Sequence, residues 1–227
     1  MHQPAFQATV KAGVTSVMCS YNEINGIPAC ADRALLTDLL RNEWNFTKEE
    51  NFVVGDCGAV RQIFTSHHFN NSAEAAATAA MQAGVDWDCY GPFSAYSSAV
   101  SKGLLKESTL DRSITRVLTA HVRLGFFDSP SMVAYKRLPP ETINSPAHRR
   151  LARWASSRVV VLLKNSHGTL PVDFASFGAG SHIAVVGPNV DNIQALWGDY
   201  AGPSAGANAT AHQAAVDELG ADRVKYA

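Results

Sequence analysis

The chain has 227 residues, of which 46% are hydrophobic and 17% charged, and its formal net charge is -1. This composition is typical of one or two packed domains and argues against a disordered protein. No strongly basic patch predicts a nucleic-acid partner, and no run of about 18 apolar residues predicts a membrane span. Because Met1 is followed by polar His2 and Gln3, we expect no signal peptide within the chain.

The first part of the chain alternates short apolar runs with helical patterns. Strands are expected at 14–18, 52–54 and 85–88, and helices at 34–41, 73–83 and 109–124. Such alternation is typical of an α/β fold with a parallel sheet. Segment 127–146 follows, and its four prolines predict an interdomain linker, because proline continues neither helices nor central strands.

The rest of the chain has the pattern of a second unit. Helices are expected at 147–157 and 211–220, strands at 159–163 and 182–186, and a strand start at 223–224. These few elements cannot cover both faces of a parallel sheet, and the strands of the first part cannot close a barrel, which needs about eight. We therefore expect a chain that is truncated at both ends.

Polar residues follow each expected strand of the first part. Tyr21 comes soon after the first strand, Asp56 directly after the second, and Asp86 and Asp88 end the third. In parallel α/β folds the carboxyl ends of the strands surround one shared pocket. A single aspartate after a strand is more often a helix cap or turn residue, but the convergence of three strand ends favours a functional site.

Several motifs carry a family resemblance. Residues 16–22 (SVMCSYN) and 25–30 (NGIPAC) resemble the strand-six segment of the glycoside hydrolase family 3 barrel. Residues 52–60 (FVVGDCGAV) resemble the nucleophile strand of that family, and residues 83–89 (AGVDWDC) resemble the strand-eight signature of its β-xylosidase branch. Residues 159–165, 168–171, 183–188 and 197–202 are similar to the opening of the family's α/β-sandwich domain.

This resemblance implies the fold and the site. Residues 1–126 would form the C-terminal part of a TIM-type (β/α)8 barrel, 127–146 a linker, and 147–227 the start of an α/β sandwich. Asp56 would be the nucleophile of a retaining β-glycosidase, and Tyr21 would lie beside it and keep the carboxylate ionised and oriented. Met18 resembles an apolar residue that lines the sugar-binding subsite, although a core methionine is an equal alternative. No metal or cofactor is implied.

The residue after the nucleophile bears on the substrate. β-Glucosidases of the family usually carry Ser-Asp-Trp and β-xylosidases Ser-Asp-Cys, so Cys57 implies a xylan 1,4-β-xylosidase that releases xylose from xylo-oligosaccharides. Gly55 and Gly58 depart from the serine and aspartate usual at these positions. A β-glucosidase or α-L-arabinofuranosidase of the same family stays open, as does an inactive carbohydrate-binding remnant.

The family's acid/base residue normally comes from a later part of the sandwich domain, so this chain alone is expected to be nearly inactive.

The four cysteines allow three pairings, and none of their spacings is the C-x-x-C of a zinc site. The turn-forming residues Asn25-Gly26 and Pro28 favour a disulfide between Cys19 and Cys30. Adjacent barrel strands would favour a second disulfide between Cys57 and Cys89. Four reduced, buried thiols are the alternative.

Three glycosylation sequons begin at Asn45, Asn70 and Asn208. Together with the cysteines they predict a secreted, glycosylated protein, because both features belong to an oxidising compartment. Chance occurrence of these short motifs in a cytosolic protein is the alternative.

Two other motifs are set aside. Residues 202–206 (GPSAG) fit the G-x-S-x-G elbow of serine hydrolases. The elbow needs a strained turn at the serine, Ser204, however, and the ring of Pro203 fixes φ at a value that does not allow this turn. His67 and His68 suggest a metal pair, but adjacent side chains diverge and no ligand set completes them. We therefore interpret His67 and His68 as loop histidines.

Overall fold

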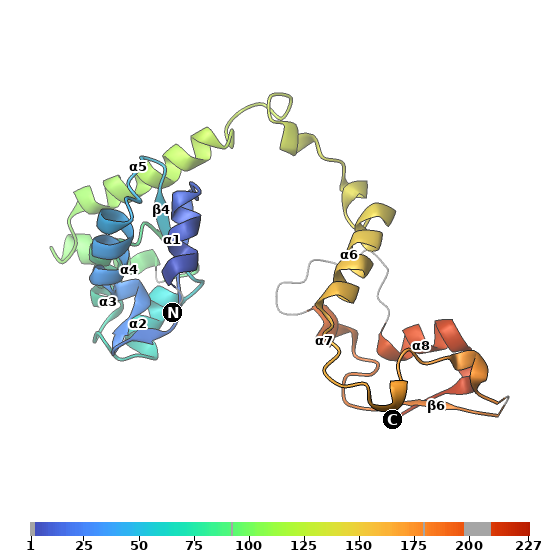
Figure 1. Ribbon diagram of the computed structural model, residues 1–227. Helices are drawn as coiled ribbons and strands as arrows, with labels where there is room; N and C mark the ends of the chain where they lie inside the picture. The colour runs from blue at the N-terminus through green and yellow to red at the C-terminus, as the bar shows by residue number, and fades with distance from the viewer. Residues whose placement is uncertain (1–2, 92, 179, 198–209) are drawn as a thin grey trace. The chain divides into compact units, whose positions relative to one another are not determined.

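The computed structural model describes residues 3–91, 93–178, 180–197 and 210–227. The chain divides into two compact units, Met1–Arg137 and Leu138–Ala227 (Figure 1). The division falls inside the expected linker 127–146, which carries the 3-10 turns Ala134–Arg137 and Pro140–Thr142.

Within its described residues, the first unit is built on a parallel sheet of three strands in the order β1-β4-β5. β1 spans Ser16–Cys19, β4 spans Phe52–Gly55 and β5 spans Trp87–Asp88. The strands lie in or beside the apolar runs from which they were expected. The prediction of an α/β fold with a parallel sheet is therefore confirmed.

The sheet has one buried and one open face. Two rows of Cα partners cross it, Met18 with Val54 and Trp87, then Cys19 with Gly55 and Asp88. The second row is buried, whereas Met18 is 55% and Trp87 42% exposed. Because successive side chains of a strand point to opposite faces, Asp56 continues the open face on which Val54 lies.

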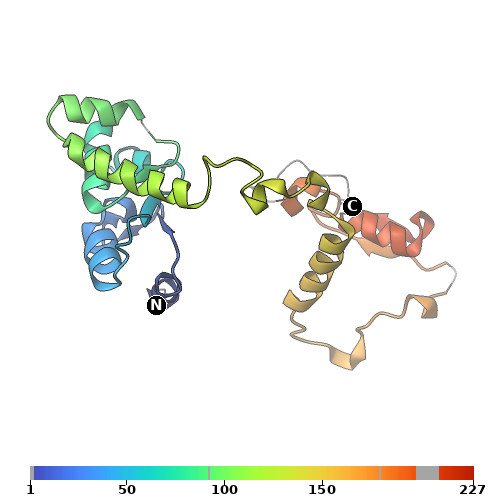
Figure 2. The same cartoon turned by 90° about the horizontal axis from the view of Figure 1, so that it is seen from above.

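The first unit also contains helices. They are α1 (Gln3–Lys11), η2 (Ala34–Glu43), α2 (Ala59–Thr65), α3 (Ala73–Ala83), α4 (Phe93–Ser101) and α5 (Glu107–Arg123). The helices expected at 34–41, 73–83 and 109–124 are confirmed as η2, α3 and α5, whereas α1, α2 and α4 were not predicted. α5 packs against β4, β5 and α3 (Figures 1 and 2).

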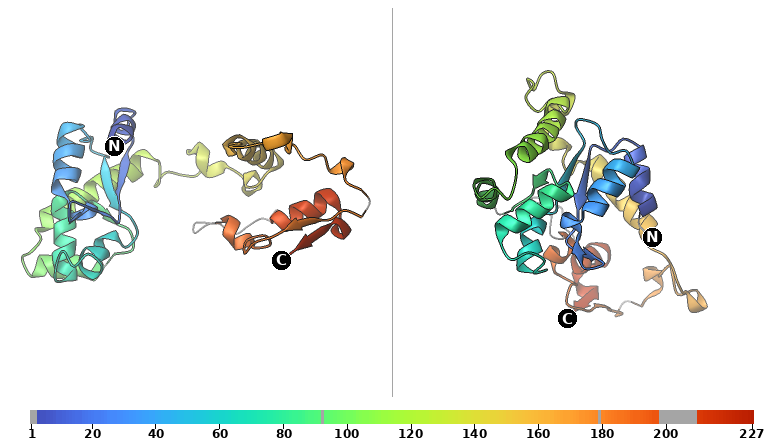
Figure 3. Two further views of the ribbon diagram at one scale, coloured as in Figure 1. Left: turned by 60° about the horizontal axis from the view of Figure 1, so that its bottom comes forward. Right: turned by 90° about the vertical axis from the view of Figure 1, so that its left-hand side faces the viewer.

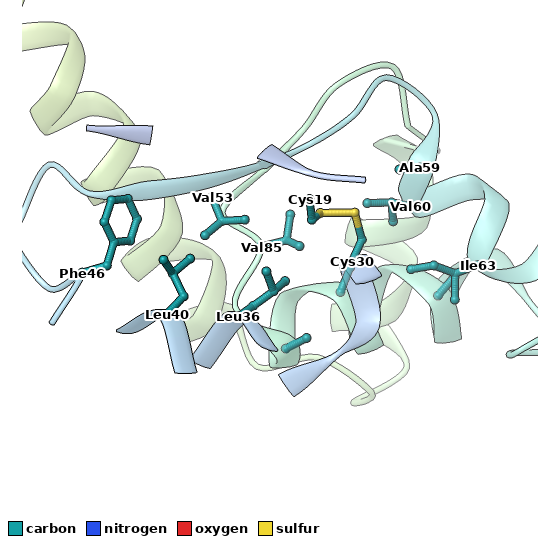
Figure 4. Packing of buried hydrophobic residues seen from close by; sticks show 13 residues of the cluster. Cys19, Cys30, Leu36, Leu40, Phe46, Val53, Ala59, Val60, Ile63 and Val85 are labelled. Atoms are coloured by element: carbon teal, nitrogen blue, oxygen red, sulfur yellow. A yellow bond between two sulfur atoms is a disulfide. The ribbon is translucent and has the colours of Figure 1, made fainter. Parts of the chain in front are cut away.

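The core of the first unit lies between β4 and helices η2, α2 and α3. Its buried side chains include Leu36, Leu40, Phe46, Val53, Val60, Ile63 and Val85 (Figure 4). Val53, Val60 and Ile63 are 0% exposed. This burial fixes β4 against α2, the two elements that flank Asp56.

A short hairpin follows β1. Its strands are β2 (Glu23–Ile24) and β3 (Ile27–Pro28), and its two loop residues have positive φ, 53° at Asn25 and 82° at Gly26. Asn-Gly favours this type of two-residue turn because both residues tolerate left-handed backbone. The hairpin leads into the 3-10 turn Ala29–Ala31 and returns Cys30 to Cys19, where the expected disulfide forms with the Cα atoms 5.2 Å apart.

A buried ion cluster joins three elements of the first unit. The Asp86 carboxylate, 1% exposed, accepts hydrogen bonds from Arg41 of η2, from Arg116 of α5 at 2.9 Å and from the Val53 N–H of β4 at 2.9 Å. Burial lowers the pKa of Arg41, and the charge of Asp86 opposes that shift. The carboxylate therefore neutralises a guanidinium that burial alone would disfavour.

The second unit carries less regular structure. Its elements are α6 (Pro146–Val159), β6 (Ile183–Val185), α7 (Ile193–Trp197), α8 (Ala211–Leu219), β7 (Val224–Tyr226) and the 3-10 turns Ser166–Gly168, Phe174–Ser176 and Ala221–Arg223. β6 pairs in parallel with β7 (Figure 3), which confirms the strands expected near 182–186 and 223–224. The helices expected at 147–157 and 211–220 are confirmed as α6 and α8. Ser204 and Asn208 lie outside the described residues.

The strand expected at 159–163 is wrong. α6 runs through Val159, and residues 160–164 belong to no strand. Residues 160–163 are between 59% and 91% exposed. A strand needs a hydrogen-bonded neighbour, and the described residues place none beside this apolar run.

In the part of the chain that the structure describes, no helix is both long and apolar enough to cross a bilayer.

Candidate active site

Asp56 sits at the carboxyl end of β4. Its N–H donates to the carbonyl of Cys19 at 3.0 Å, so the pairing with β1 continues one residue beyond the strand. Its own carbonyl accepts from Ala59 N–H at 2.8 Å as α2 begins. The carboxylate is partly exposed, and its Oδ1 accepts from the Cys57 N–H at 2.7 Å. The backbone thus presents a carboxylate at the edge where the strands end.

Tyr21 lies against the same loop. Its hydroxyl donates to the carbonyl oxygen of Cys57 at 2.6 Å, and the residue is 38% exposed. The structure therefore brings the Tyr21 hydroxyl to the backbone of the residue that follows Asp56, although Tyr21 and Cys57 are 36 residues apart in sequence. The hydrogen bond holds the main chain directly after the carboxylate, so the phenol fixes the loop that carries Asp56.

A disulfide ties the ends of β4 and β5 together. Cys57 and Cys89 form the second expected bridge, with Cα atoms 4.3 Å apart, and the Gly58 N–H donates to the Cys89 carbonyl at 2.7 Å. Cys57 follows Asp56 directly. The disulfide and the hydrogen bond therefore hold the loop after β4 from the side of β5, whereas Tyr21 holds it from the side of β1.

The two glycines that depart from the family pattern fit their surroundings. Gly55 is buried, and a Cβ there would lie 3.3 Å from Cγ2 of Val60, so a serine would require a small shift of that side chain. Gly58 has a φ of 87°, a left-handed conformation that glycine adopts without strain. It begins α2 with this turn. Both departures leave the carboxylate of Asp56 in place.

Met18 lies on the open face of the sheet. It lines a groove of about 650 Å³ between β1, α1 and η2, together with apolar side chains that include Phe6, Val10 and Trp44. Asp56 is not among the described residues that line this groove. Met18 is thus a surface methionine beside the strand end and not a core residue.

His67, which was expected to be a loop histidine, makes two contacts near this site. Its ring Nε2 lies 2.7 Å from the carbonyl oxygen of Tyr21, and its Nδ1 lies 3.0 Å from Oε1 of Glu23. The side chain is 18% exposed. The sequence gives no signal for these contacts, because they depend on where the end of α2 meets the loop after β1.

Asp88 is a buried carboxyl group at the end of β5. Its Oδ2 accepts from the Tyr96 hydroxyl at 2.9 Å, and among the described residues its buried Oδ1 has no hydrogen-bond partner. Burial raises the pKa of Asp88, and the hydrogen bond from Tyr96 opposes the shift. Burial and the nearby carboxylate in turn raise the pKa of Tyr96.

The raised pKa of Asp88 predicts a pH dependence of stability. Because the folded chain favours the neutral carboxyl, its contribution is complete below the unfolded pKa of about 3.9 and is lost as pH rises through the folded pKa. Asp88→Asn stays neutral and keeps an acceptor for Tyr96. Its free energy of unfolding relative to wild type should therefore increase between about pH 4 and about pH 7, as measured by urea unfolding. Asp38→Asn, at an exposed carboxylate of η2, controls for the amide itself. An Asp88→Asn variant that follows wild type at both pH values would contradict this.

The described sequons differ in exposure. Asn45 is exposed, and its Oδ1 accepts from the Thr47 hydroxyl at 3.0 Å. Asn70 is partly buried, and its Oδ1 is buried without a hydrogen-bond partner among the described residues. Asn45 is therefore the more accessible acceptor of these two.

Comparison with known proteins identifies the family. A model of the glycosyl hydrolase family 3 N terminal domain matches residues 1–120. Probable exo-1,4-beta-xylosidase bxlB of Aspergillus oryzae is 39% identical over 202 residues, and beta-D-xylosidase 1 of Arabidopsis thaliana is 40% identical over 200 residues. These matches cover 88% and 87% of this chain, but 25% of each relative. The chain therefore spans about a quarter of the length of these relatives.

Solved structures give the same result. The GH3 exo-beta-xylosidase XlnD, in complex with a xylobiose aziridine activity based probe, is 32% identical with a TM-score of 0.82, over 99% of this chain and 28% of that one. The b-glucosidase EmGH1 from Erythrobacter marinus is 35% identical with a TM-score of 0.76, over 99% of this chain and 29% of that one. Because the family model covers 120 of the 227 residues, the chain belongs to glycosyl hydrolase family 3.

Proposed function

We propose that Asp56 is the catalytic nucleophile of a retaining, exo-acting β-glycosidase. The observation that carries the proposal is the placement of this carboxylate at the end of β4, with its Oδ1 held by the Cys57 N–H and its loop held by Tyr21. A carboxylate so fixed can attack an anomeric carbon and form a covalent glycosyl-Asp56 ester. Water then releases the sugar with its configuration retained.

The reaction also needs a second carboxyl group. In retaining enzymes it lies about 5–5.5 Å from the nucleophile, protonates the leaving oxygen and then activates water. By the family resemblance, this group belongs to a part of the sandwich domain outside the matched motifs. Because the chain spans about a quarter of the length of the relatives that it matches, we propose that turnover needs parts of the enzyme that these matches do not cover.

The proposed substrate is a β-xyloside, with xylose released from the non-reducing ends of xylo-oligosaccharides. The support is that the relatives from Aspergillus oryzae and Arabidopsis thaliana are named xylosidases and that XlnD was solved with a xylobiose probe. Cys57, bridged to Cys89, stands where the glucosidases of the family usually carry tryptophan.

A β-glucosidase is the second candidate, because the similar structure of EmGH1 is named as one. No observation favours an α-L-arabinofuranosidase. A carbohydrate-binding remnant without turnover would not need a nucleophile, and the presence of both Asp56 and Tyr21 in the chain supports an active enzyme instead.

The proposed fold and location follow from the same resemblance. We propose that residues 1–126 are the C-terminal part of a (β/α)8 barrel, 127–146 a linker and 147–227 the start of an α/β sandwich. The parallel sheet with helices on its buried face, and a site at the carboxyl strand ends, support the barrel. Two disulfides among the described residues, and an exposed sequon at Asn45, support secretion.

The substrate proposal predicts a ratio of specificity constants. For the product of the complete coding sequence, kcat/KM on an aryl β-xyloside should exceed that on the matching aryl β-glucoside by about 10–200-fold, the range that contacts to one hydroxymethyl group can set. Steady-state kinetics with the same leaving group measures it. A ratio below one would identify a glucosidase, and release of the inverted anomer, detected by NMR, would exclude the retaining mechanism.

A further inference from the structure

The ring of His67 connects two loops that flank Asp56. The histidine follows α2, and its N–H donates to the Gln62 carbonyl at 2.9 Å, which holds it at the end of that helix. From there Nε2 reaches the Tyr21 carbonyl oxygen at 2.7 Å, and Nδ1 reaches the Glu23 carboxylate at 3.0 Å. α2 itself starts three residues after Asp56, at Ala59.

The chemistry of the partners fixes the direction of these bonds. A backbone carbonyl only accepts hydrogen bonds, so Nε2 carries a proton and donates to Tyr21. The ring Nδ1 faces a carboxylate oxygen of Glu23, so the ring bridges the Tyr21 carbonyl and this side chain. The ring is 18% exposed, and water therefore competes only in part for either bond.

Tyr21 is consequently held at both ends. Its carbonyl accepts from His67, and its hydroxyl donates to the Cys57 carbonyl at 2.6 Å. Together these bonds attach the loop after β1 to the loop after β4 and to the end of the helix that follows it. Loss of the first bond would remove one of the contacts that hold the loop after β1, and with it part of the restraint on the phenol that contacts the Cys57 carbonyl.

We propose that His67 is a positioning residue, which acts through Tyr21 on the placement of the Asp56 loop. The proposal rests on the proposed role of Asp56 as nucleophile. Misplacement of a reacting group by about 1 Å can cost on the order of 100-fold in rate, and this cost falls on the transition state more than on substrate binding. Loss of the His67–Tyr21 bond should therefore lower kcat much more than it raises KM.

Three variants of the enzyme test the contributions of the two ring nitrogens separately. His67→Gln places an amide N–H near the Nε2 position and retains the bond to Tyr21, His67→Asn places one near Nδ1, and His67→Ala removes both. We expect the glutamine variant to keep kcat on an aryl β-xyloside within about threefold of wild type. We expect the asparagine and alanine variants to lose about 10–100-fold in kcat.

The controls distinguish positioning from folding. His212→Gln changes a histidine of the second unit that also faces a carboxylate, Asp191 at 3.8 Å, and should leave kcat unchanged. Thermal unfolding of every variant shows whether kcat is measured on folded protein. If the alanine variant does not fold, the comparison of glutamine with asparagine decides the question.

The outcomes are distinct. A high kcat for glutamine with a low kcat for asparagine supports the proposal. Wild-type kcat in the asparagine variant, or an equal loss in the glutamine and asparagine variants, overturns it. Failure of a mechanism-based fluoroxyloside to label Asp56 in the wild-type protein would instead remove the proposed function on which the inference rests.

Discussion

Asp56→Asn is expected to lower kcat/KM on an aryl β-xyloside by at least about 10³-fold, a loss typical of enzymes that lack their nucleophile. The amide has nearly the shape of the carboxylate, but it forms no glycosyl ester and carries no charge to stabilise an oxocarbenium-like transition state. Its Oδ1 still accepts from the Cys57 N–H, which is 2.7 Å from Oδ1 in the native loop. The loss should therefore be chemical and not structural.

Steady-state kinetics and thermal unfolding of the same preparation test this expectation. Asp111→Asn, at an exposed carboxylate of α5, is the matched control and should keep wild-type activity. An Asp56→Asn protein with activity within tenfold of wild type would exclude Asp56 as nucleophile. Loss of activity together with a large fall in Tm would point to misfolding.

Asp86→Ala is expected to cost about 3–5 kcal/mol in the free energy of unfolding, the usual effect of removing one partner of a buried ion pair. The carboxylate is 1% exposed and accepts from Arg41, Arg116 and the Val53 N–H. Without it, the Arg41 side chain, 7% exposed, stays buried with an uncompensated charge. Burial already lowers the pKa of this guanidinium, so the loss of its partner is costly.

Urea unfolding measures this loss. Lys102→Ala is the control, because it breaks the pair of Lys102 with Glu74, in which the Lys102 side chain is 59% exposed. Solvent-exposed pairs contribute little, so the control should change stability far less than Asp86→Ala does. Equal destabilisation by the two variants would show that the buried cluster has no special role in the first unit.

Much of the first unit was predictable from local pattern. The apolar runs predicted the parallel strands because each strand is buried on one face. Asn25-Gly26 predicted a turn because both residues accept positive φ, but the two short strands of the hairpin were not predicted. Helix α2 was missed because its seven residues are too short to show an amphipathic period. The run 159–163 was wrongly predicted as a strand, because composition says nothing about whether a pairing neighbour is present.

The candidate site was predictable only in part. Asp56 and Tyr21 were proposed as site residues from the strand ends and from the family resemblance, which carries information about residues distant in sequence. His67 was missed because its contact with Tyr21 spans 46 residues and involves a backbone carbonyl, which leaves no mark on the sequence. The Asp86 cluster was missed for a similar reason, since Arg41 lies 45 residues before it.

The most direct test of the account is covalent labelling of the protein from its complete coding sequence with a mechanism-based fluoroxyloside. With such a reagent a retaining β-glycosidase accumulates the glycosyl-enzyme ester on its nucleophile, because fluorine slows both steps and a reactive leaving group restores only the first. Peptide mass spectrometry should locate one fluoroxylosyl group on Asp56, and labelling should disappear in Asp56→Asn. A fluoroxylosyl group on any other residue would contradict the assignment.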